Sequence, residues 1–265
     1  MKSYTKENIK KALVGAKIKK GDSVFLTTSI GMLGYPSTNK KNLPLVTSEW
    51  ILESFKEIVG EKGNIFVPAY SYTFTKRKKL FDQKVTKSDI GYFPNFFLKQ
   101  KKVVRSPDPM MSVSGIGPDA KKILLKISNN SFGKNCVFER LLKLKKLKCC
   151  TLGLGYNWIP FLHYLDWVNK VKFRFNKTFF GYILKNNKKT KLKWIYFARF
   201  HQNMNFPDGY KIGKMAFKKK LFYHSKIGSS KIYVINYKNF FAFAKKITKT
   251  NKWLTVSRPG IESLK

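Results

Sequence analysis

Residues 23–37 read SVFLTTSIGMLGYPS, and this stretch decides the fold. It opens with an apolar run typical of a buried strand, which passes directly into the small hydroxyls of Thr27, Thr28 and Ser29 and then into glycines. The runs NIFVPAY at 64–70 and KCCTLGLG at 148–155 have the same apolar character. Because such strands alternate with helical segments, we predict an α/β fold in which helices cover both faces of a mixed central sheet.

Apolar spacing and helix-end residues predict the helices. The N-terminal segment 1–22 carries apolar residues at helical intervals. The segment TSEWILESFKEIVG at 47–60 reads as a second helix, with Thr47 or Ser48 as its cap and Gly60 at its end. Further helices are predicted for PDAKKILLKI at 118–127, VFERLLKL at 137–144, KMAFKKKLF at 214–222 and KNFFAFAKKI at 238–247.

Two strand-like runs in the C-terminal half predict a hairpin. They are KTFFGYILK at 177–185 and LKWIYFARF at 192–200, and the polar NNKKTK separates them. The chain contains neither an internal repeat nor a low-complexity linker. We therefore expect a single domain over residues 1–265, with a hairpin insertion at roughly 172–200.

Segment composition and cysteine spacing bear on location and metals. The sequence contains no apolar run near the roughly 18 residues of a membrane span, and its N-terminus reads as an amphipathic helix. We expect a cytoplasmic protein without a membrane partner. The three cysteines, Cys136, Cys149 and Cys150, offer neither a disulfide framework nor metal-ligand spacing, so we expect reduced thiols and no metal.

The formal net charge of +40 admits two explanations. A basic surface attracts nucleic acid. However, only six of the 54 basic residues are arginine, the side chain that base readout and bidentate phosphate contacts favour. Abundant Lys, Asn, Ile and Phe fit a coding sequence rich in A and T. We do not expect nucleic acid as a partner, although a basic nucleic-acid-binding protein stays an alternative. Anionic small ligands such as coenzyme A suit this charge.

Two connecting segments are candidate sites. Hydroxyls and backbone N–H groups at residues 27–29 can face a thioester, although a strand end capped by hydroxyls explains them equally well. In VVRSPDPMMSVSGIG, Pro107 and Pro109 favour extended geometry at the preceding Ser106 and Asp108, so we expect a rigid connection. There Arg105 can contact a phosphate and Asp108 an amine, whereas a salt bridge between them is the structural alternative.

The third candidate is a histidine with a nearby acid. His163 and Asp166 stand three residues apart on a predicted helix among aromatic side chains, just after a glycine-rich strand end. A histidine of this kind is suited to be a general base, and a core histidine is the alternative. His201 and His224 lack a comparable acid. Cys149 or Cys150 as a nucleophile, with His163 as base, is a further alternative, disfavoured by the apolar strand around both thiols.

Six blocks of the sequence, in this order, resemble the aminoglycoside 3-N-acetyltransferase family. The blocks are GDSVFLTTSIGMLG, GNIFVPAYSY, VVRSPDPMMSVSGIGPDA, FLHYLD, NKTFFG and GKMAFKKKLFYHSKIGSSKIYVI. The resemblance implies transfer of an acetyl group from acetyl-CoA to an amine of an amino sugar or aminoglycoside. It implies a cofactor site of Thr27, Thr28, Ser29, Arg105 and Ser112, a substrate contact at Asp108, and catalysis by His163 with Asp166.

Three departures from the family pattern leave the acceptor open. Thr27 stands where the family commonly has His, Asp108-Pro109 stands for His-Pro, and Asp166 stands for Glu. The leading hypothesis is direct acetyl transfer in a ternary complex with coenzyme A, without a covalent enzyme intermediate. An N-acyltransferase of nucleotide-linked amino sugars in polysaccharide biosynthesis is the alternative, and a longer acyl group and a homodimer stay open.

Overall fold

The computed structural model describes residues 2–185, 187–200 and 204–260. The helices are α1 (Lys6–Gly15), α2 (Leu43–Val59), α3 (Tyr92–Leu98), α4 (Ala120–Leu124), α5 (Val137–Leu142), α6 (Leu162–Val168), α7 (Tyr210–Lys218) and α8 (Tyr237–Thr250), with 3-10 turns η1 (Ile30–Leu33), η2 (Thr73–Thr75) and η3 (Lys252–Thr255). The strands are β1 (Ser3–Tyr4), β2 (Ser23–Thr28), β3 (Tyr35–Pro36), β4 (Asn64–Pro68), β5 (Leu80–Asp82), β6 (Val104–Arg105), β7 (Val113–Ile116), β8 (Leu147–Leu152), β9 (Arg174–Lys185), β10 (Lys188–Arg199), β11 (Phe222–Ile227) and β12 (Ser230–Asn236).

A seven-stranded mixed sheet with the order β11-β12-β8-β2-β4-β7-β6 forms the centre of the molecule. The three middle strands β8, β2 and β4 are parallel, and the outer pairings are antiparallel. The carboxyl ends of the parallel strands therefore meet at one edge of the sheet, which is where ligands bind in α/β folds.

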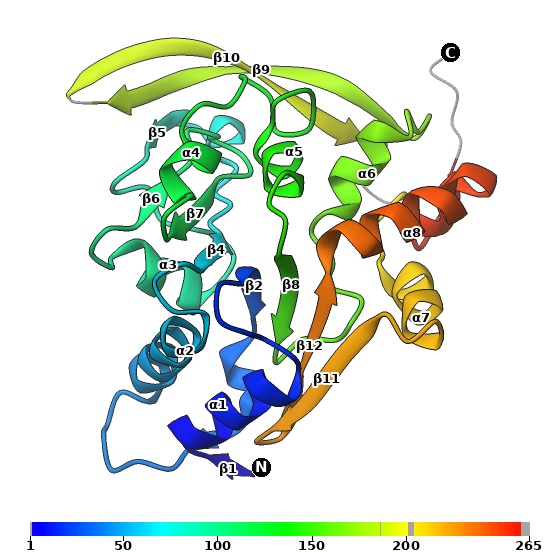
Figure 1. Cartoon of the computed structure of the whole chain (residues 1–265). Coiled ribbons are helices and arrows are strands. Elements are labelled where there is room, and N and C mark those ends of the chain that lie inside the picture. Colours follow the sequence, from blue (N-terminus) through cyan, green and yellow to red (C-terminus); the bar gives the residue numbers. More distant parts are fainter. Residues whose placement is uncertain (1, 186, 201–203, 261–265) are drawn as a thin grey trace.

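Alternating strand residues divide the core into two layers. In β2, Val24 and Leu26 pack with α1, α2 and α3, whereas Phe25 faces the layer built by α4, α5, α6, α7 and α8. The strands β4 and β8 alternate in the same way. Helices thus cover both faces of the sheet, and the predicted fold class is confirmed (Figure 1).

The capping residues at the helix starts differ in part from those predicted from the sequence. A capping box between Thr5 and Asn8 begins α1. Helix α2 begins earlier than predicted, because Asn42 caps it by accepting from the Leu45 N–H, and Gly60 ends it with a φ of 63°. The predicted cap Ser48 lies inside the helix instead, and its hydroxyl donates to the Pro44 carbonyl oxygen.

The predicted hairpin is present as β9 and β10, paired from Arg174↔Arg199 to Lys185↔Lys188. Its strands include most of the polar stretch that reads as a loop in the sequence. Figure 1 shows the hairpin arching across the top of the molecule, from α6 on one side to β5 on the other. A second antiparallel pair, β11 with β12, extends the central sheet after α7.

The helices and the cysteines were also compared with the expectations from the sequence. Among the helices formed by the described residues, none combines the length and the apolar character that crossing a membrane requires. Cys136, Cys149 and Cys150 are buried free thiols.

Candidate active site

A cavity of about 750 Å³ opens at the edge where the parallel strands end. Its lining residues come from segment 26–31 at the end of β2 and in the turn after it, from segments 68–72 and 90–94, which start at the end of β4, from segment 154–163 beyond β8, and from 207–209. The volume lies within the roughly 300–1,000 Å³ typical of small-molecule sites. The cavity brings Thr27, Thr28 and Ser29 into one site with His163.

The end of β2 supplies hydroxyl groups to this cavity. Thr27 donates its hydroxyl to the Cys150 carbonyl oxygen at 3.2 Å, which ties it to β8. The hydroxyls of Thr28 and Ser29 make no hydrogen bond to any described residue, and both side chains are partly exposed. Gly153, with a φ of 75°, lies directly against the Ser29 carbonyl oxygen, where a Cβ atom would collide with it. The loop after β2 is therefore held close to β8 with two hydroxyls free for a ligand.

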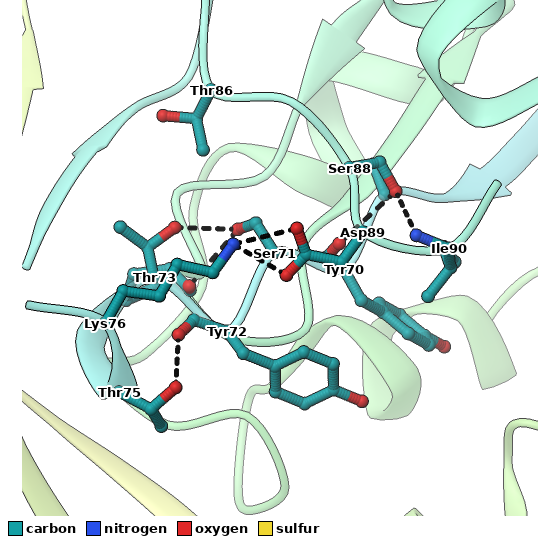
Figure 2. A network of polar contacts seen from close by, with 12 residues as sticks. Tyr70, Ser71, Tyr72, Thr73, Thr75, Lys76, Thr86, Ser88, Asp89 and Ile90 are labelled. Carbon is teal, nitrogen blue, oxygen red and sulfur yellow. Dashed lines mark hydrogen bonds and ion pairs between the residues drawn. The ribbon is translucent and has the colours of Figure 1, made fainter. Parts of the chain in front are cut away.

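Tyr70 and Tyr72 form a second wall, with ring centroids 6.5 Å apart. Figure 2 shows the polar network behind them, from which both rings extend on the same side. Lys76 and Asp89 are ion-paired at 2.7 Å, and the Asp89 N–H donates to the Tyr70 carbonyl oxygen at 2.8 Å. These contacts fasten the segment 88–94 to the segment 70–76. Tyr72 has a left-handed backbone (φ 44°), an uncommon conformation for a bulky residue and one often found at functional sites.

Another part of the lining is His163 from α6. Its Nδ1 lies 3.0 Å from Nη2 of Arg174, the first residue of β9. The carboxylate of Asp166 does not reach the ring, because its Oδ2 bonds Nε of Arg174 at 2.8 Å. Arg174 thus stands between the histidine and the acid that the sequence pairs directly. Asp166 is therefore linked to the His163 ring through Arg174.

Burial and charge shift the pKa values of this group. The pKa of His163 lies well below its ordinary value because of burial first, and then because of the positive charges of Arg174 and Arg199. Burial raises the pKa of Asp166 to about 6, and the neighbouring Arg174 opposes that rise. At neutral pH the histidine is accordingly neutral and the aspartate ionised.

Arg105 and Ser112 lie in the interior instead of the cavity. Arg105 is 4% exposed and donates to the Ser112 hydroxyl and to the carbonyls of Ala69 and Thr86. Burial lowers the pKa of its guanidinium to about 10. These contacts occupy the donors that the sequence hypothesis assigned to coenzyme A, so both residues support the Tyr70 segment from behind.

Asp108 is also interior, and it faces backbone donors in place of a ligand amine. Its Oδ1 accepts from the N–H groups of Met110 and Met111 and from the Ser131 hydroxyl, at 2.8 to 3.0 Å. The side chain is fully buried, and it is not ion-paired with Arg105 within the described part of the chain. The salt bridge considered from the sequence is therefore absent from the described residues, and Asp108 is not among the residues that line the cavity.

Other candidate groups lie away from the cavity. Burial raises the pKa of the Cys149 and Cys150 thiols in β8, which makes them poor nucleophiles. His224 stacks on Phe217 at 5.7 Å between ring centroids. His201 lies outside the described residues. Groups of three or more His, Cys, Asp or Glu side chains able to hold a metal ion do not occur in the described ranges.

Three residues of the site were not predicted from the sequence. Asp208 is the one carboxylate among the described residues that line the cavity, and it stands in a Pro-Asp-Gly stretch that reads as a turn. Tyr72 follows a predicted strand end in AYSY, which is its only signal. Arg174 has a clearer sequence signal, because an arginine between Phe173 and Phe175 indicates a buried charge that needs a partner.

Comparison with known proteins finds solved structures of the same fold. The structure of AAC-IIIb in a binary complex with CoASH has a TM-score of 0.79 and 14% identity, and the match covers 98% of this chain and 100% of the other. AAC-VIa bound to sisomicin has a TM-score of 0.78 and 16% identity, with 94% of this chain and 98% of the other covered. The YokD protein from Bacillus subtilis has a TM-score of 0.77 and 17% identity, with 93% of this chain and 100% of the other covered. Among curated proteins, none matches the sequence. A sequence model described as aminoglycoside 3-N-acetyltransferase matches residues 41–249, so the resemblance read from the sequence is confirmed. The chain belongs to the aminoglycoside 3-N-acetyltransferase family and is an N-acetyltransferase.

Proposed function

We propose that this enzyme transfers an acetyl group from acetyl-CoA directly to an amine of an amino sugar, with both substrates bound together in the cavity at the end of β2, β4 and β8. Family membership supports the acetyl transfer. The complex of AAC-IIIb with CoASH, a relative of the same fold, supports coenzyme A as the donor. The observation that carries the proposal is the meeting of free hydroxyls, His163 and a carboxylate in one cavity.

The donor end of the cavity is the loop after β2. Thr28 and Ser29 have hydroxyls without a protein partner among the described residues, so each can donate to the thioester oxygen. Donors placed where negative charge develops stabilise the tetrahedral intermediate, and one such donor contributes about 3–4 kcal/mol to the barrier. The cysteine thiols are buried, which favours direct transfer over an acyl-cysteine intermediate.

The acceptor end is assigned to Asp208. An amino sugar arrives as a cation, and Asp208 offers a carboxylate at the cavity wall, where its Oδ1 also accepts from the Tyr210 N–H at 2.7 Å. The related AAC-VIa structure holds sisomicin, which supports a cationic amino sugar as the acceptor class. Asp208 takes the role that the sequence hypothesis gave to Asp108.

The test is an assay of free thiol release with acetyl-CoA and a panel of acceptors. Asp208→Asn should raise KM for the amine acceptor by roughly ten- to hundredfold, as expected for loss of a charge-assisted hydrogen bond of about 1.5–3 kcal/mol. The KM for acetyl-CoA should hardly change. Glu61→Gln removes an exposed charge outside this cavity and is the matched control.

The panel also separates the alternatives. Aminoglycosides as best substrates support a resistance-type role, whereas nucleotide-linked amino sugars as best substrates indicate polysaccharide biosynthesis. Turnover of sugars that carry hydroxyls but no amine would contradict the proposal. Binding of oligonucleotides with a steep salt dependence and no response to coenzyme A would favour the nucleic-acid-binding alternative.

A further inference from the structure

Trp158 places an exposed indole in the lining of the cavity. Its side chain is 57% exposed, whereas its neighbours Ile159 and Phe161 are 7% and 1% exposed and pack into the core. The other four tryptophans of the chain are buried or half-buried. Tryptophan gains much from leaving water, so an indole that faces a cavity is available to stack on a ligand.

The backbone around Trp158 is fixed on both sides. Its N–H donates to the Gly155 carbonyl oxygen at 3.3 Å. The carbonyl oxygen of the preceding Asn157 lies so close to Gly209 that a Cβ atom there would come within 2.1 Å of it. Gly209 directly follows Asp208, the carboxylate of the proposed acceptor end. The loop that carries the indole is therefore packed against the segment that carries the carboxylate.

The charge of the lining suits a cationic ligand. The chain has 54 basic residues among 265, yet neither lysine nor arginine occurs among the described residues that line the cavity. Asp208 is the one carboxylate in that described lining. A positively charged acceptor thus meets a carboxylate and an aromatic face, both of which attract cations.

A six-membered sugar ring that carries an amine matches these two groups. Such a ring has a face of C–H groups and a rim of polar substituents. The C–H groups carry a partial positive charge and the face of an indole is negative, so the two faces attract one another over an apolar area. The amine at the rim is then free to reach a carboxylate. An open-chain amine satisfies the carboxylate but has no flat face for the indole.

We infer that Trp158 is a specificity-determining residue, on which the C–H face of the amine-bearing ring of the acceptor stacks while Asp208 binds the amine. The inference rests on the proposed function for the chemical class of the acceptor. It divides recognition between two residues, because Asp208 selects positive charge and Trp158 selects a flat ring. Removal of the indole should therefore weaken acceptor binding without changing the chemistry at the thioester.

Quenching of tryptophan fluorescence by acrylamide tests the contact without turnover. Coenzyme A replaces acetyl-CoA, so no acetyl group is transferred, and the probes are neamine and UDP-glucosamine, one from each candidate class of acceptor. Because Trp158 is the most exposed indole, it contributes most of the quenching. We expect at least one of the two sugars to reduce the quenching of the wild type but not that of Trp158→Phe. Wild-type quenching that neither sugar changes would overturn the inference.

Steady-state kinetics with three substitutions separate stacking from volume. Trp158→Phe keeps a smaller aromatic face, Trp158→Leu keeps apolar volume without a flat face, and Trp158→Ala removes both. With the better acetylated of the two sugars, we expect KM for the acceptor to rise less than about threefold in the Phe variant and at least about tenfold in the Leu and Ala variants. Both kcat and KM for acetyl-CoA should stay within about twofold, because an interaction made equally in the ground state and the transition state affects only the acceptor's KM.

Phe180→Ala is the matched control. Phe180 is 55% exposed on β9 and lies outside the described lining of the cavity, so its loss should leave both KM values at those of the wild type. An acceptor KM within about twofold of the wild type in Trp158→Ala would overturn the inference. Equal acceptor KM values in the Leu and Phe variants would also contradict it, since a residue that only fills volume does not need a flat face.

The inference and the proposed function fail in different ways. If neither sugar is acetylated by the wild type, the proposed function fails, while the quenching result still decides whether Trp158 contacts a sugar ring. If a sugar is acetylated but leaves the indole open to acrylamide, the proposed function stands and the inference fails. The Trp158 side chain is exposed, so we expect all three variants to fold, and the wild-type quenching does not depend on them.

Discussion

Asp108 carries a prediction at the scale of a single residue. Burial raises the pKa of its carboxyl from 3.8 to about 6, despite three hydrogen bonds to Oδ1, and Oδ2 has no partner among the described residues. Because the folded-state pKa is raised, the folded state holds a proton that the unfolded chain has lost. This contribution to stability is complete below about pH 3.8 and is lost as the pH rises through about 6.

Replacing Asp108 with Asn should remove that pH dependence. The amide oxygen can still accept from the two backbone N–H groups. Relative to the variant, the wild type should lose on the order of 1–3 kcal/mol of unfolding free energy between pH 4 and pH 7.5. Urea unfolding at several pH values measures this, with Glu61→Gln as a control for the loss of one exposed charge. A difference between wild type and variant that does not change with pH would contradict the shifted pKa.

Individual site residues were predictable to different degrees. Thr28, Ser29 and His163 follow strand ends, and strand ends converge on one edge in any parallel sheet, so their meeting in one cavity follows from position alone. The direction in which a side chain points could not be predicted from the sequence. Two prolines indicate that the segment around Asp108 is rigid, but rigidity is equally compatible with a carboxylate that turns inward to backbone donors. The placement of Arg174 between Asp166 and His163 depends on a contact between α6 and β9, which no local pattern specifies.

The junction of β2 and β8 carries a prediction at the scale of elements. Gly153 and Gly21 have similar positive φ angles, 75° and 78°, but only Gly153 lies against another backbone, at the Ser29 carbonyl, whereas an added Cβ at Gly21 would meet open space. Gly21→Ala should cost about 1–2 kcal/mol of unfolding free energy through its φ alone. Gly153→Ala should cost more and should also weaken coenzyme A binding, because it moves the loop after β2.

Thermal unfolding and titration calorimetry with coenzyme A compare the two variants. Equal destabilisation, with coenzyme A affinity unchanged in both, would show that the close approach at Ser29 is unimportant for the donor site. A selective loss of affinity in Gly153→Ala would link the strand junction to the thioester end of the cavity.

Elements were predictable where their pattern is strong. The apolar strands and the alternating hairpin were recognised because burial on one or both faces demands such residues. The start of α2 was placed too late because Thr47 and Ser48 are good caps in isolation, while Asn42 precedes a leucine and a proline that look like a loop. The strand pair β11 and β12 was not predicted, since lysines and serines dilute its alternation at the sheet edge.

The charge distribution carries a prediction for the whole molecule. The chain has 54 basic and 14 acidic residues, and the ion pairs among the described residues engage four lysines and one arginine. Most cations therefore repel one another across the surface. Raising the salt concentration from about 0.01 M to about 0.15 M shortens the Debye length from about 30 Å to about 8 Å, so the melting temperature at pH 7 should rise.

A melting curve at each of several sodium chloride concentrations measures this effect. Sodium acetate at equal ionic strength is the control, because screening depends on ionic strength and binding of a particular anion does not. A melting temperature that falls with salt would mean that attraction, not repulsion, dominates the surface.

Strand β9 links the side chain that contacts His163 to the short strand β5. Strand β9 begins at Arg174, whose guanidinium contacts His163, and at Tyr182 it pairs with Leu80 of β5; Figure 1 shows β5 below the hairpin. The span between these two anchors is eight residue steps, or about 26 Å at roughly 3.3 Å per residue. An extended strand hardly stretches, so the separation of Arg174 from the β5 pairing at Tyr182 is set by the number of residues between them. Two residues more or fewer would preserve which face each side chain occupies while changing this separation by roughly 7 Å. A change of strand length would therefore shift Arg174, the support of His163, relative to β5 without turning any side chain to the other face.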